Sequence, residues 1–239
     1  MLTREEIRHF RHCGYLKRSG VLPPALVTEL KETILADMAA EAEPVGRDEN
    51  GRVVRLSQVL DRAPVFHRAA TYPLLIDALE DLLGPCIEVV KNRHNHATLN
   101  LAIGARDTYH RDAVQWSRGL LSAILYLQDT HLENGCTQIV PGSHLLPGLN
   151  LLHKVEEEQW VAASNLLSQA VPVPMSAGDI LLMDGLVFHR IGPNHTKNTR
   201  MSMTLGYHSA DELVESQDVK RLVIVRGKYT YRGNDRKLT

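Results

Sequence analysis

Arg200-Met201-Ser202-Met203-Thr204-Leu205-Gly206 is the stretch of this chain that indicates the fold most clearly. Polar side chains at positions 200, 202 and 204 alternate with apolar side chains at positions 201, 203 and 205. In an extended chain, side chains two residues apart point to the same side. The stretch therefore predicts a β-strand with one apolar face and one polar face.

A second alternating stretch lies between Ile87 and Ala102. One face of this predicted strand is polar and the other is apolar. A polar strand face usually meets solvent, but it can also line a wet cavity, and the alternation alone leaves both interpretations open. The polar face carries Asn92, His94, His96, Thr98 and Asn100, and the apolar face carries Ala97, Leu99 and Leu101.

The remaining elements surround these two strands. Apolar runs at 120–127, 180–183 and 186–189, separated by glycine and proline turns, predict further strands. Helices are expected over 3–14, 23–42 and 72–84, a loop over 44–52, and a helix-prone polar segment over 151–170 that could cover a cavity mouth. Short strands after a helical start predict a mainly β protein with flanking helices and a double-stranded β-helix core, the jelly-roll or cupin-like arrangement.

The length favours one domain over residues 1–239. Within it we expect a helical N-terminal part at 1–84 that packs on the core, and a jelly-roll core at 87–208 with an insert at 148–170. The tail at 209–239 suggests no role.

Charge and cysteine content exclude several classes of protein. Lys plus Arg is 27 and Asp plus Glu is 28, which gives no electrostatic footprint for nucleic acid or for an anionic membrane. Cys13, Cys86 and Cys136 are far apart and form no C-x-x-C pair, which argues against a disulfide framework and a zinc site. The charged first residues do not resemble a signal peptide, and no run is long enough to span a membrane. We therefore expect a cytoplasmic protein that binds a small molecule.

Tyr109-His110-Arg111-Asp112 holds a His-x-Asp step with the spacing of metal ligands. If the segment is extended, His110 and Asp112 converge on one point while Arg111 faces the other way, so Arg111 should be dispensable for iron. Two histidines and one carboxylate form the ligand set of non-heme Fe(II) oxygenases. The step also arises by chance, as an ordinary pair at a strand end that its neighbours satisfy.

His189 is the candidate third ligand, because it follows an apolar run that could lie beside the first two ligands in a sheet. Arg200 follows eleven residues later, with Ser202 on the same strand face. A guanidinium with a nearby hydroxyl offers a bidentate fork and one further donor to a carboxylate.

The order of these features resembles the phytanoyl-CoA dioxygenase family of Fe(II)- and 2-oxoglutarate-dependent oxygenases. The resemblance extends from near the N-terminus to about residue 208, and its motifs are specific in combination. They are Glu6-Ile7 to Gly14-Tyr15-Leu16, His110-Arg111-Asp112 with Trp116, Asn134-Gly135-Cys136, Pro141-Gly142-Ser143-His144, Gly178-Asp179, and His189 with Arg200.

The resemblance implies a role for each matching position. His110, Asp112 and His189 would bind Fe(II), and Arg200 with Ser202 would hold the distal carboxylate of 2-oxoglutarate. Thr98 and Asn100, on the polar face of the preceding strand, could help to hold this co-substrate. The candidates for substrate contact are Trp116, Asn92, His94 and His96, for each of which an ordinary packed or solvated side chain is an equal alternative.

The activity that the resemblance implies is oxidation of a small organic molecule by molecular oxygen, with release of succinate and carbon dioxide. Similar halogenases have a small residue in place of the carboxylate, so Asp112 favours hydroxylation, or else desaturation, epimerisation or cyclisation. Specialised metabolism is one setting for such a reaction. Two alternatives stay open: a cupin-like protein that binds a metal or ligand without turnover, and a zinc hydrolase with the same three ligands. The substrate and the oligomeric state are not determined by the sequence.

Overall fold

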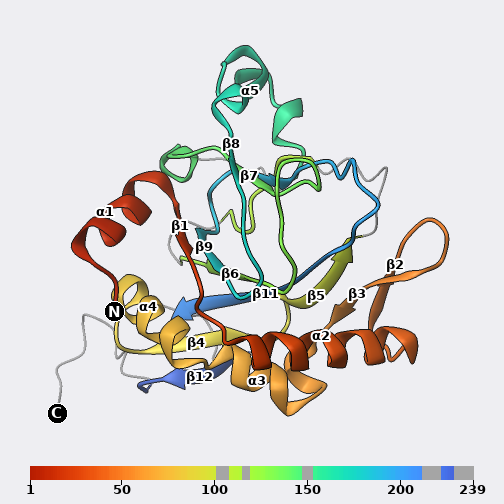
Figure 1. Cartoon of the computed structure of the whole chain (residues 1–239). Helices are drawn as coiled ribbons and strands as arrows, with labels where there is room; N and C mark the ends of the chain where they lie inside the picture. The colour runs from red at the N-terminus through yellow and green to blue at the C-terminus, as the bar shows by residue number, and fades with distance from the viewer. Residues whose placement is uncertain (101–107, 115–118, 147–152, 212–221, 229–239) are drawn as a thin grey trace, which may run out of the picture.

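Two antiparallel β-sheets form the core of this computed structural model, which describes residues 1–100, 108–114, 119–146, 153–211 and 222–228 (Figure 1). The larger sheet has nine strands, and the smaller has three. The path of the larger sheet is β1 (Tyr15–Arg18), β9 (Ile180–Asp184), β6 (Leu121–Tyr126), β11 (Arg200–Ser209), β5 (Asn95–Asn100), β3 (Val53–Ser57) and β2 (Val45–Arg47), while β4 (Ile87–Val90) pairs with β11 and with β12 (Leu222–Arg226). The smaller sheet is β10 (His189–Ile191), β7 (Thr137–Ile139) and β8 (Val171–Val173).

The smaller sheet gains a fourth segment at its edge, because His110 pairs with His189 as an isolated bridge. Segment 109–112, β10, β7 and β8 then face β5, β11, β6 and β9 of the larger sheet. Two facing four-stranded layers with this alternation of strands form a jelly roll. The predicted double-stranded β-helix core is confirmed.

Strand β11 is the centre of the larger sheet and contains the stretch that predicts a strand at 200–206. It pairs with β5 on one side and with β6 on the other, so that Ser202 lies between Thr98 and Tyr126. Residues opposite each other in an antiparallel pair share a face. The polar residues of β11 and β5 therefore lie together on one face, and their apolar residues lie on the opposite face.

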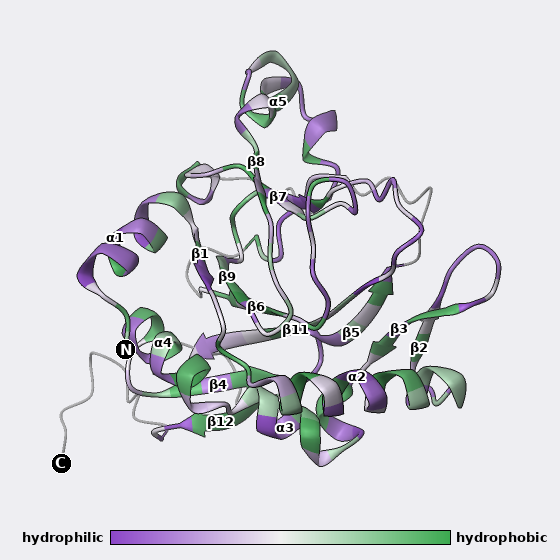
Figure 2. Cartoon of the chain, viewed as in Figure 1, coloured by the Kyte–Doolittle hydropathy of each residue, from purple (hydrophilic) through white to green (hydrophobic). Residues whose placement is uncertain are grey.

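Helices cover the apolar face of the larger sheet (Figure 1). Met203 and Leu205 of β11 belong to the same core as Leu30 and Ile34 of the longest helix, and all four are fully buried. Burial of each such side chain stabilises the fold by roughly 1.5–3 kcal/mol. Figure 2 shows hydrophobic segments on these helices where they meet the sheet. The covering helices are α2 (Pro24–Ala39), α3 (Pro64–Ala70) and α4 (Pro73–Leu83), with a short 3-10 turn η1 (Val59–Asp61) before α3.

Helix α1 (Arg4–Cys13) leads into edge strand β1. The Thr3 side chain accepts from the Glu6 backbone, and the Glu6 side chain accepts from the Thr3 backbone, which is the capping box that the sequence predicts. Gly14 ends the helix in a left-handed conformation. No helix in the described ranges combines the length and the apolar character needed to cross a membrane.

Three local predictions are wrong in detail. The expected loop at 44–52 contains strand β2 and is the first half of a β2–β3 hairpin, because the turn formers occupy only residues 48–51. The expected strand at 87–102 is divided into β4 and β5 by a bend at 91–94, where His94 adopts a left-handed φ of 43°. A turn at 185–186 and a bend at 187 follow β9, and the strand begins only at His189.

The helix-prone insert forms only short helical segments in its described part. They are η3 (Val155–Glu157), α5 (Gln159–Ala163) and η4 (Leu167–Gln169), and α5 stands at the top of Figure 1. Val155 and Val161 are buried against Tyr109, Val140 and Phe188. The insert thus packs against the segment that carries His110, while residues 147–152 lie outside the described ranges. A further turn, η2 (Ser143–Leu145), follows β7.

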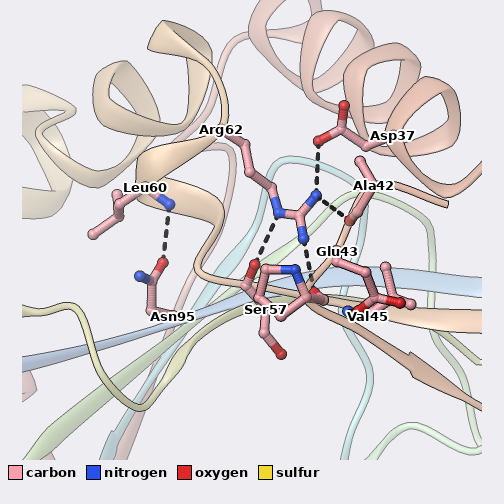
Figure 3. Close-up of polar contacts among 9 residues, drawn as sticks. Asp37, Ala42, Glu43, Val45, Ser57, Leu60, Arg62 and Asn95 are labelled. Atoms are coloured by element: carbon pink, nitrogen blue, oxygen red, sulfur yellow. Dashed lines mark hydrogen bonds and ion pairs between the residues drawn. The ribbon is translucent and has the colours of Figure 1, made fainter. Parts of the chain in front are cut away.

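Arg62 fastens the β2–β3 hairpin to helix α2 (Figure 3). Its guanidinium donates to the carbonyl oxygens of Ser57, Ala42 and Pro44 at 2.7–2.8 Å, and it lies 3.4 Å from the Asp37 carboxylate. The Arg62 side chain is only 9% exposed. One buried guanidinium therefore holds the start and the end of the hairpin together.

Replacement of Arg62 with methionine should lower the free energy of unfolding by about 3 kcal/mol, because three carbonyl oxygens would lose a charged donor. Urea unfolding followed by circular dichroism measures the change. The control is Asp37→Asn, which removes only the long ion pair and should cost less than about 1 kcal/mol. Equal losses in the two variants would contradict the assignment of the carbonyl contacts as the dominant interaction.

Candidate metal centre and cavity

A cavity of about 570 Å³ lies on the polar face of the larger sheet. Residues of both sheets line it. On the larger sheet, residues that lie opposite one another on neighbouring strands form rows of polar side chains that face the cavity. In one row Arg55 pairs with Thr98 and Thr98 with Ser202, and in the next row His96 pairs with Thr204. The alternative left open by the sequence is thereby resolved: the polar face lines a cavity. The residues that line it are Arg55, Asn92, Arg93, His94, His96, Thr98, Asn100, His110, Arg111, Asp112, Ile124, Tyr126, Thr130, Gly135, Thr137, His153, His189, Ile191, Arg200, Met201, Ser202 and Thr204.

His110, Asp112 and His189 meet in this cavity, with one potential ligand atom from each lying within 4.8 Å of the other two. The backbone sets this arrangement. The amide of His110 donates to the carbonyl of His189 at 3.0 Å, and the amide of His189 donates to the carbonyl of His110 at 3.1 Å. This paired bridge brings the two imidazoles side by side, with ring centroids 4.3 Å apart.

Both imidazoles are oriented by backbone carbonyls. Nδ1 of His110 lies 3.0 Å from the carbonyl of Thr108, and Nδ1 of His189 lies 3.0 Å from the carbonyl of Val187. A carbonyl only accepts, so each Nδ1 carries the hydrogen, and the lone pair of each ring is on Nε2. This is the arrangement by which a protein fixes the tautomer of a metal-ligating histidine.

The Asp112 carboxylate accepts a short hydrogen bond from Ser122 Oγ. Its other oxygen lies 3.7 Å from Nδ1 of His94 and 3.8 Å from Nε2 of His189. Burial by itself would raise the pKa of Asp112, but the charges of His189 and His94 and the Ser122 hydrogen bond together hold it below its usual value. The group is therefore a carboxylate at neutral pH, and with two oriented imidazoles it fits a divalent iron ion by donor type.

Arg200 and Ser202 lie on the cavity face of β11, as the alternation predicts. Arg200 is buried, and its Nη1 lies 3.4 Å from the carbonyl of Gly192. Gly135 leaves room for this guanidinium, since a Cβ at that position would lie 2.7 Å from Arg200 Nη1. Ser202 Oγ lies 3.3 Å from Thr98 Oγ1.

Thr98, Asn100, Asn92, His94 and His96 all line the cavity, and Asn100 pairs directly with Arg200 in the sheet. Trp116 lies outside the described residues. The sequence interpretation missed Arg55 and His153, which come from the β2–β3 hairpin and the insert. The alternation of Arg55 and Ser57 with the buried Leu56 could have assigned Arg55 to the polar face of a strand. Only the pairing of β3 with β5 shows that this face belongs to the cavity.

Arg111 points away from the metal ligands, as predicted, yet it is one of the largest fully buried side chains. Its guanidinium lies 4.3 Å from the centre of the Phe188 ring, and Nη2 donates to the carbonyl of Ser143 at 3.1 Å. Nε and Nη1 have no hydrogen-bond partner among the described residues. Burial lowers the pKa of Arg111 to about 10, against the opposing charge of Asp184. Arg111 thus holds the His110 segment against Phe188, next to His189.

A family model described as phytanoyl-CoA dioxygenase (PhyH) matches residues 10–202. The chain belongs to the phytanoyl-CoA dioxygenase family. The match extends through the His110–Asp112 step and ends at Ser202.

Two relatives and one solved structure illustrate the similarity of this chain to known proteins. The multifunctional dioxygenase ausE of Aspergillus calidoustus is 27% identical over 202 residues, covering 78% of this chain and 66% of ausE. Phytanoyl-CoA dioxygenase domain-containing protein 1 of Mus musculus is 30% identical over 160 residues, covering 59% of this chain and 52% of the mouse protein. The chain therefore spans about half to two thirds of the length of these relatives.

The solved structure of the non-heme alpha ketoglutarate dependent epimerase SnoN from nogalamycin biosynthesis superposes with a TM-score of 0.75. The two chains are 23% identical, and the superposition covers 93% of this chain and 98% of SnoN. This similarity shows that the chain shares the fold of SnoN.

Arg111→Met should change the free energy of unfolding by less than about 1 kcal/mol, because methionine fills much of the volume and removes a buried cation, two nitrogens of which lack partners among the described residues. Arg111→Ala should cost about 2–4 kcal/mol through the cavity it leaves. Chemical unfolding of the two variants makes the comparison. If Arg111→Met lowers the free energy of unfolding as much as Arg111→Ala does, the charge of Arg111 itself stabilises the fold, which contradicts the prediction.

His96 should make the metal-free protein less stable in mild acid. Burial, then the charges of Arg55 and His94, lower its pKa from 6.5 to about 3, with Asp112 opposing them. Below pH 6.5, His96 binds a proton in the unfolded chain but stays unprotonated in the folded chain. The free energy of unfolding therefore falls as the pH falls. Between pH 6.5 and 5 the wild type should lose about 1–1.5 kcal/mol more than His96→Asn. The control His67→Asn, on the exposed side of α3, should follow the wild type in urea unfolding.

Proposed function

We propose that this chain is an Fe(II)- and 2-oxoglutarate-dependent oxygenase that hydroxylates a small organic molecule and releases succinate and carbon dioxide. The observation that carries the proposal is the convergence of His110, Asp112 and His189 in a cavity that also contains Arg200 and Ser202. Membership in the phytanoyl-CoA dioxygenase family supports it. The balanced reaction takes R–H, oxygen and 2-oxoglutarate to R–OH, succinate and carbon dioxide.

In this proposal His110, Asp112 and His189 bind Fe(II). Bound iron, with 2-oxoglutarate and oxygen, supplies the oxidant that removes hydrogen from a substrate carbon. The carbonyls of Thr108 and Val187 hold the imidazoles in the ligating tautomer. Ser122 and His94 keep the Asp112 carboxylate in place.

Arg200 and Ser202 bind the distal carboxylate of 2-oxoglutarate in this proposal. The buried guanidinium provides a charged fork, and the Ser202 hydroxyl lies two residues away on the same strand face. Thr98, in contact with Ser202, and Asn100, opposite Arg200, complete the polar surface around that carboxylate. A hydrolytic zinc site would use the same three metal ligands but would leave Arg200 and Ser202 without a role.

Asp112 occupies the third ligand position, which disfavours halogenation and is compatible with hydroxylation, desaturation, epimerisation and cyclisation; hydroxylation is the outcome proposed first. Epimerisation is the second candidate, since SnoN, whose fold this chain shares, is named an epimerase. The same initial removal of hydrogen serves both reactions, and they differ in what returns to the substrate carbon. Product analysis of an identified substrate, with oxygen-18 gas as the tracer, separates them, because only hydroxylation places labelled oxygen in the product.

The iron site is tested by mixing anaerobic protein with Fe(II) and 2-oxoglutarate. The wild type should develop a metal-to-ligand absorption band, and His110→Ala should abolish it because one of three ligands is lost. His67→Ala, in which the histidine is exposed on α3, is the matched control and should retain the band. The absence of a band in the wild type, or its persistence in His110→Ala, would overturn the proposed function.

Turnover is tested by a succinate-release screen over a substrate panel, with Asp112→Ala as the inactive control. Substrate-stimulated succinate that depends on oxygen is the expected result. A wild-type band without succinate above background would indicate a cupin-like binding protein, and product formed without oxygen would indicate hydrolysis.

A further inference from the structure

Four arginines and one carboxylate line the described part of the cavity. Two of these arginines belong to the co-substrate end, because Arg200 is proposed to bind 2-oxoglutarate and Arg55 lies in the same row of the sheet as Ser202. Arg111 points away from the metal ligands and holds the backbone behind them. The fourth arginine, Arg93, lies elsewhere, in the bend at 91–94 between β4 and β5.

The bend at 91–94 leaves the sheet at a single position of β11. Strand β11 pairs with β5 as far as Leu205 and with β4 from Tyr207 onward. The chain between these two pairings, residues 90–94, therefore faces Gly206 alone. Extra residues opposite one position of a partner strand form a bulge, which redirects side chains. As a result the three consecutive side chains of residues 92–94 all line the cavity, whereas a regular strand would turn every second one away.

Gly206 gives the bend its room. A Cβ at this position would lie 2.9 Å from His94 Cβ and 3.1 Å from Leu120 Cδ1. The amide of Gly206 donates to the carbonyl of His94 at 2.8 Å, and His94 has a left-handed φ of 43°. Such a conformation is unfavourable for a residue with a Cβ, so it persists only where the surrounding structure holds it, and it occurs often at ligand-binding positions.

Both ends of the bend are fastened to the body of the protein. At its start, Lys91 forms an ion pair with Asp61. After its end, the Asn95 side chain donates to the carbonyl of Lys91 at 2.9 Å and accepts from the backbone amide of Leu60 at 3.0 Å (Figure 3). The backbone that carries residues 92 and 93 is therefore held in place from both sides.

The tip of the bend carries two donors that have no partner. The side chains of Asn92 and Arg93 are exposed, and neither forms a hydrogen bond or an ion pair with a described residue. The next residue, His94, reaches the metal centre, since its Nε2 lies 3.3 Å from the backbone carbonyl of Asp112. An amide and a guanidinium on a fixed backbone beside the metal ligands are available to a ligand in the cavity.

The bend lies at the opposite end of β11 from the co-substrate residues. Ser202 and Gly206 are four residues apart, which is roughly 13 Å of strand. Asp112 lies at the Gly206 end, because it accepts from Ser122, which pairs with Gly206. A co-substrate that extends from Arg200 to the metal ligands leaves the cavity wall at the bend uncovered. Replacement of a side chain in the bend should therefore leave 2-oxoglutarate binding unchanged.

We infer that the substrate is an anion, with a carboxylate or a phosphate- or sulfate-type group bound by Arg93 and Asn92. The inference rests on the proposed function, and it assigns Arg93 to substrate specificity. A guanidinium presents a planar set of donors that matches the oxygens of such a group, and the Asn92 amide adds one further donor. Because the adjacent His94 contacts Asp112, a small molecule is long enough to reach from Arg93 to the metal ligands with its reacting carbon.

The binding test uses anaerobic protein that has been loaded with Fe(II) and 2-oxoglutarate and shows the absorption band. Phenylacetate and phenyl phosphate are the anionic probes, phenylacetamide is the neutral partner of phenylacetate, and calorimetry measures their binding. The wild type should bind at least one anion about tenfold more tightly than phenylacetamide, because only an anion forms charged hydrogen bonds with Arg93. Preference for phenyl phosphate indicates a tetrahedral anionic group in the substrate, and preference for phenylacetate indicates a carboxylate.

Arg93→Gln should weaken binding of the preferred anion about tenfold, because it removes the charged donor. Arg93→Lys should restore part of the affinity, since it returns the charge without the planar fork. Arg8→Gln, which removes an exposed arginine of α1 outside the cavity lining, is the matched control and should bind as the wild type does. The affinity for 2-oxoglutarate, read from the absorption band, should be the same in all these variants.

The inference is overturned if the wild type prefers neither anion to phenylacetamide, or if Arg93→Gln binds the preferred anion as tightly as Arg8→Gln does. A loss of affinity for 2-oxoglutarate in Arg93→Gln would also overturn it, because Arg93 would then belong to the co-substrate site. Every measurement begins from protein that shows the band, so these failures leave the proposed function standing. Absence of the band itself would instead remove the proposed function on which the inference rests.

Discussion

The two faces of strand β11 are the constraint on which the rest of this structure depends. Met201, Met203 and Leu205 are buried beneath the helices, so the opposite side chains must point into the space between the sheets. A strand has a period of two, and a shift by one residue would exchange the two faces. The hydrophobic core under the larger sheet therefore also fixes the direction of Arg200 and Ser202.

The candidate metal ligands lie on the smaller sheet and at its edge, and they face the larger sheet. His110 and His189 exchange two backbone hydrogen bonds across the smaller sheet, and Asp112 reaches the larger sheet through Ser122 of β6. The three side chains thus meet where the two layers approach each other. Backbone pairing is less easily distorted than side-chain contacts alone, which explains how segments far apart in the chain can present converging ligands.

Charge distribution distinguishes the cavity from the surface. On the surface, arginines such as Arg18 and Arg226 pair with acids. The cavity lining contains four arginines and one carboxylate, and His96 is neutral because burial and neighbouring cations lower its pKa. An excess of one sign of charge in a cavity wall is costly to the fold, so such an arrangement points to function more than to stability.

The sequence by itself determined the local geometry: which residues of β5 and β11 share a face, that His110 and Asp112 point together, and that the core is a jelly roll. These features follow from a period of two and from turn residues, which act over a few positions. Tertiary structure alone decided that the polar face lines a cavity and that His189 lies beside His110. It also decided that the 44–52 segment contributes a strand and that Arg55 lines the cavity. Those outcomes depend on pairing between remote strands, and no local period specifies which strands meet.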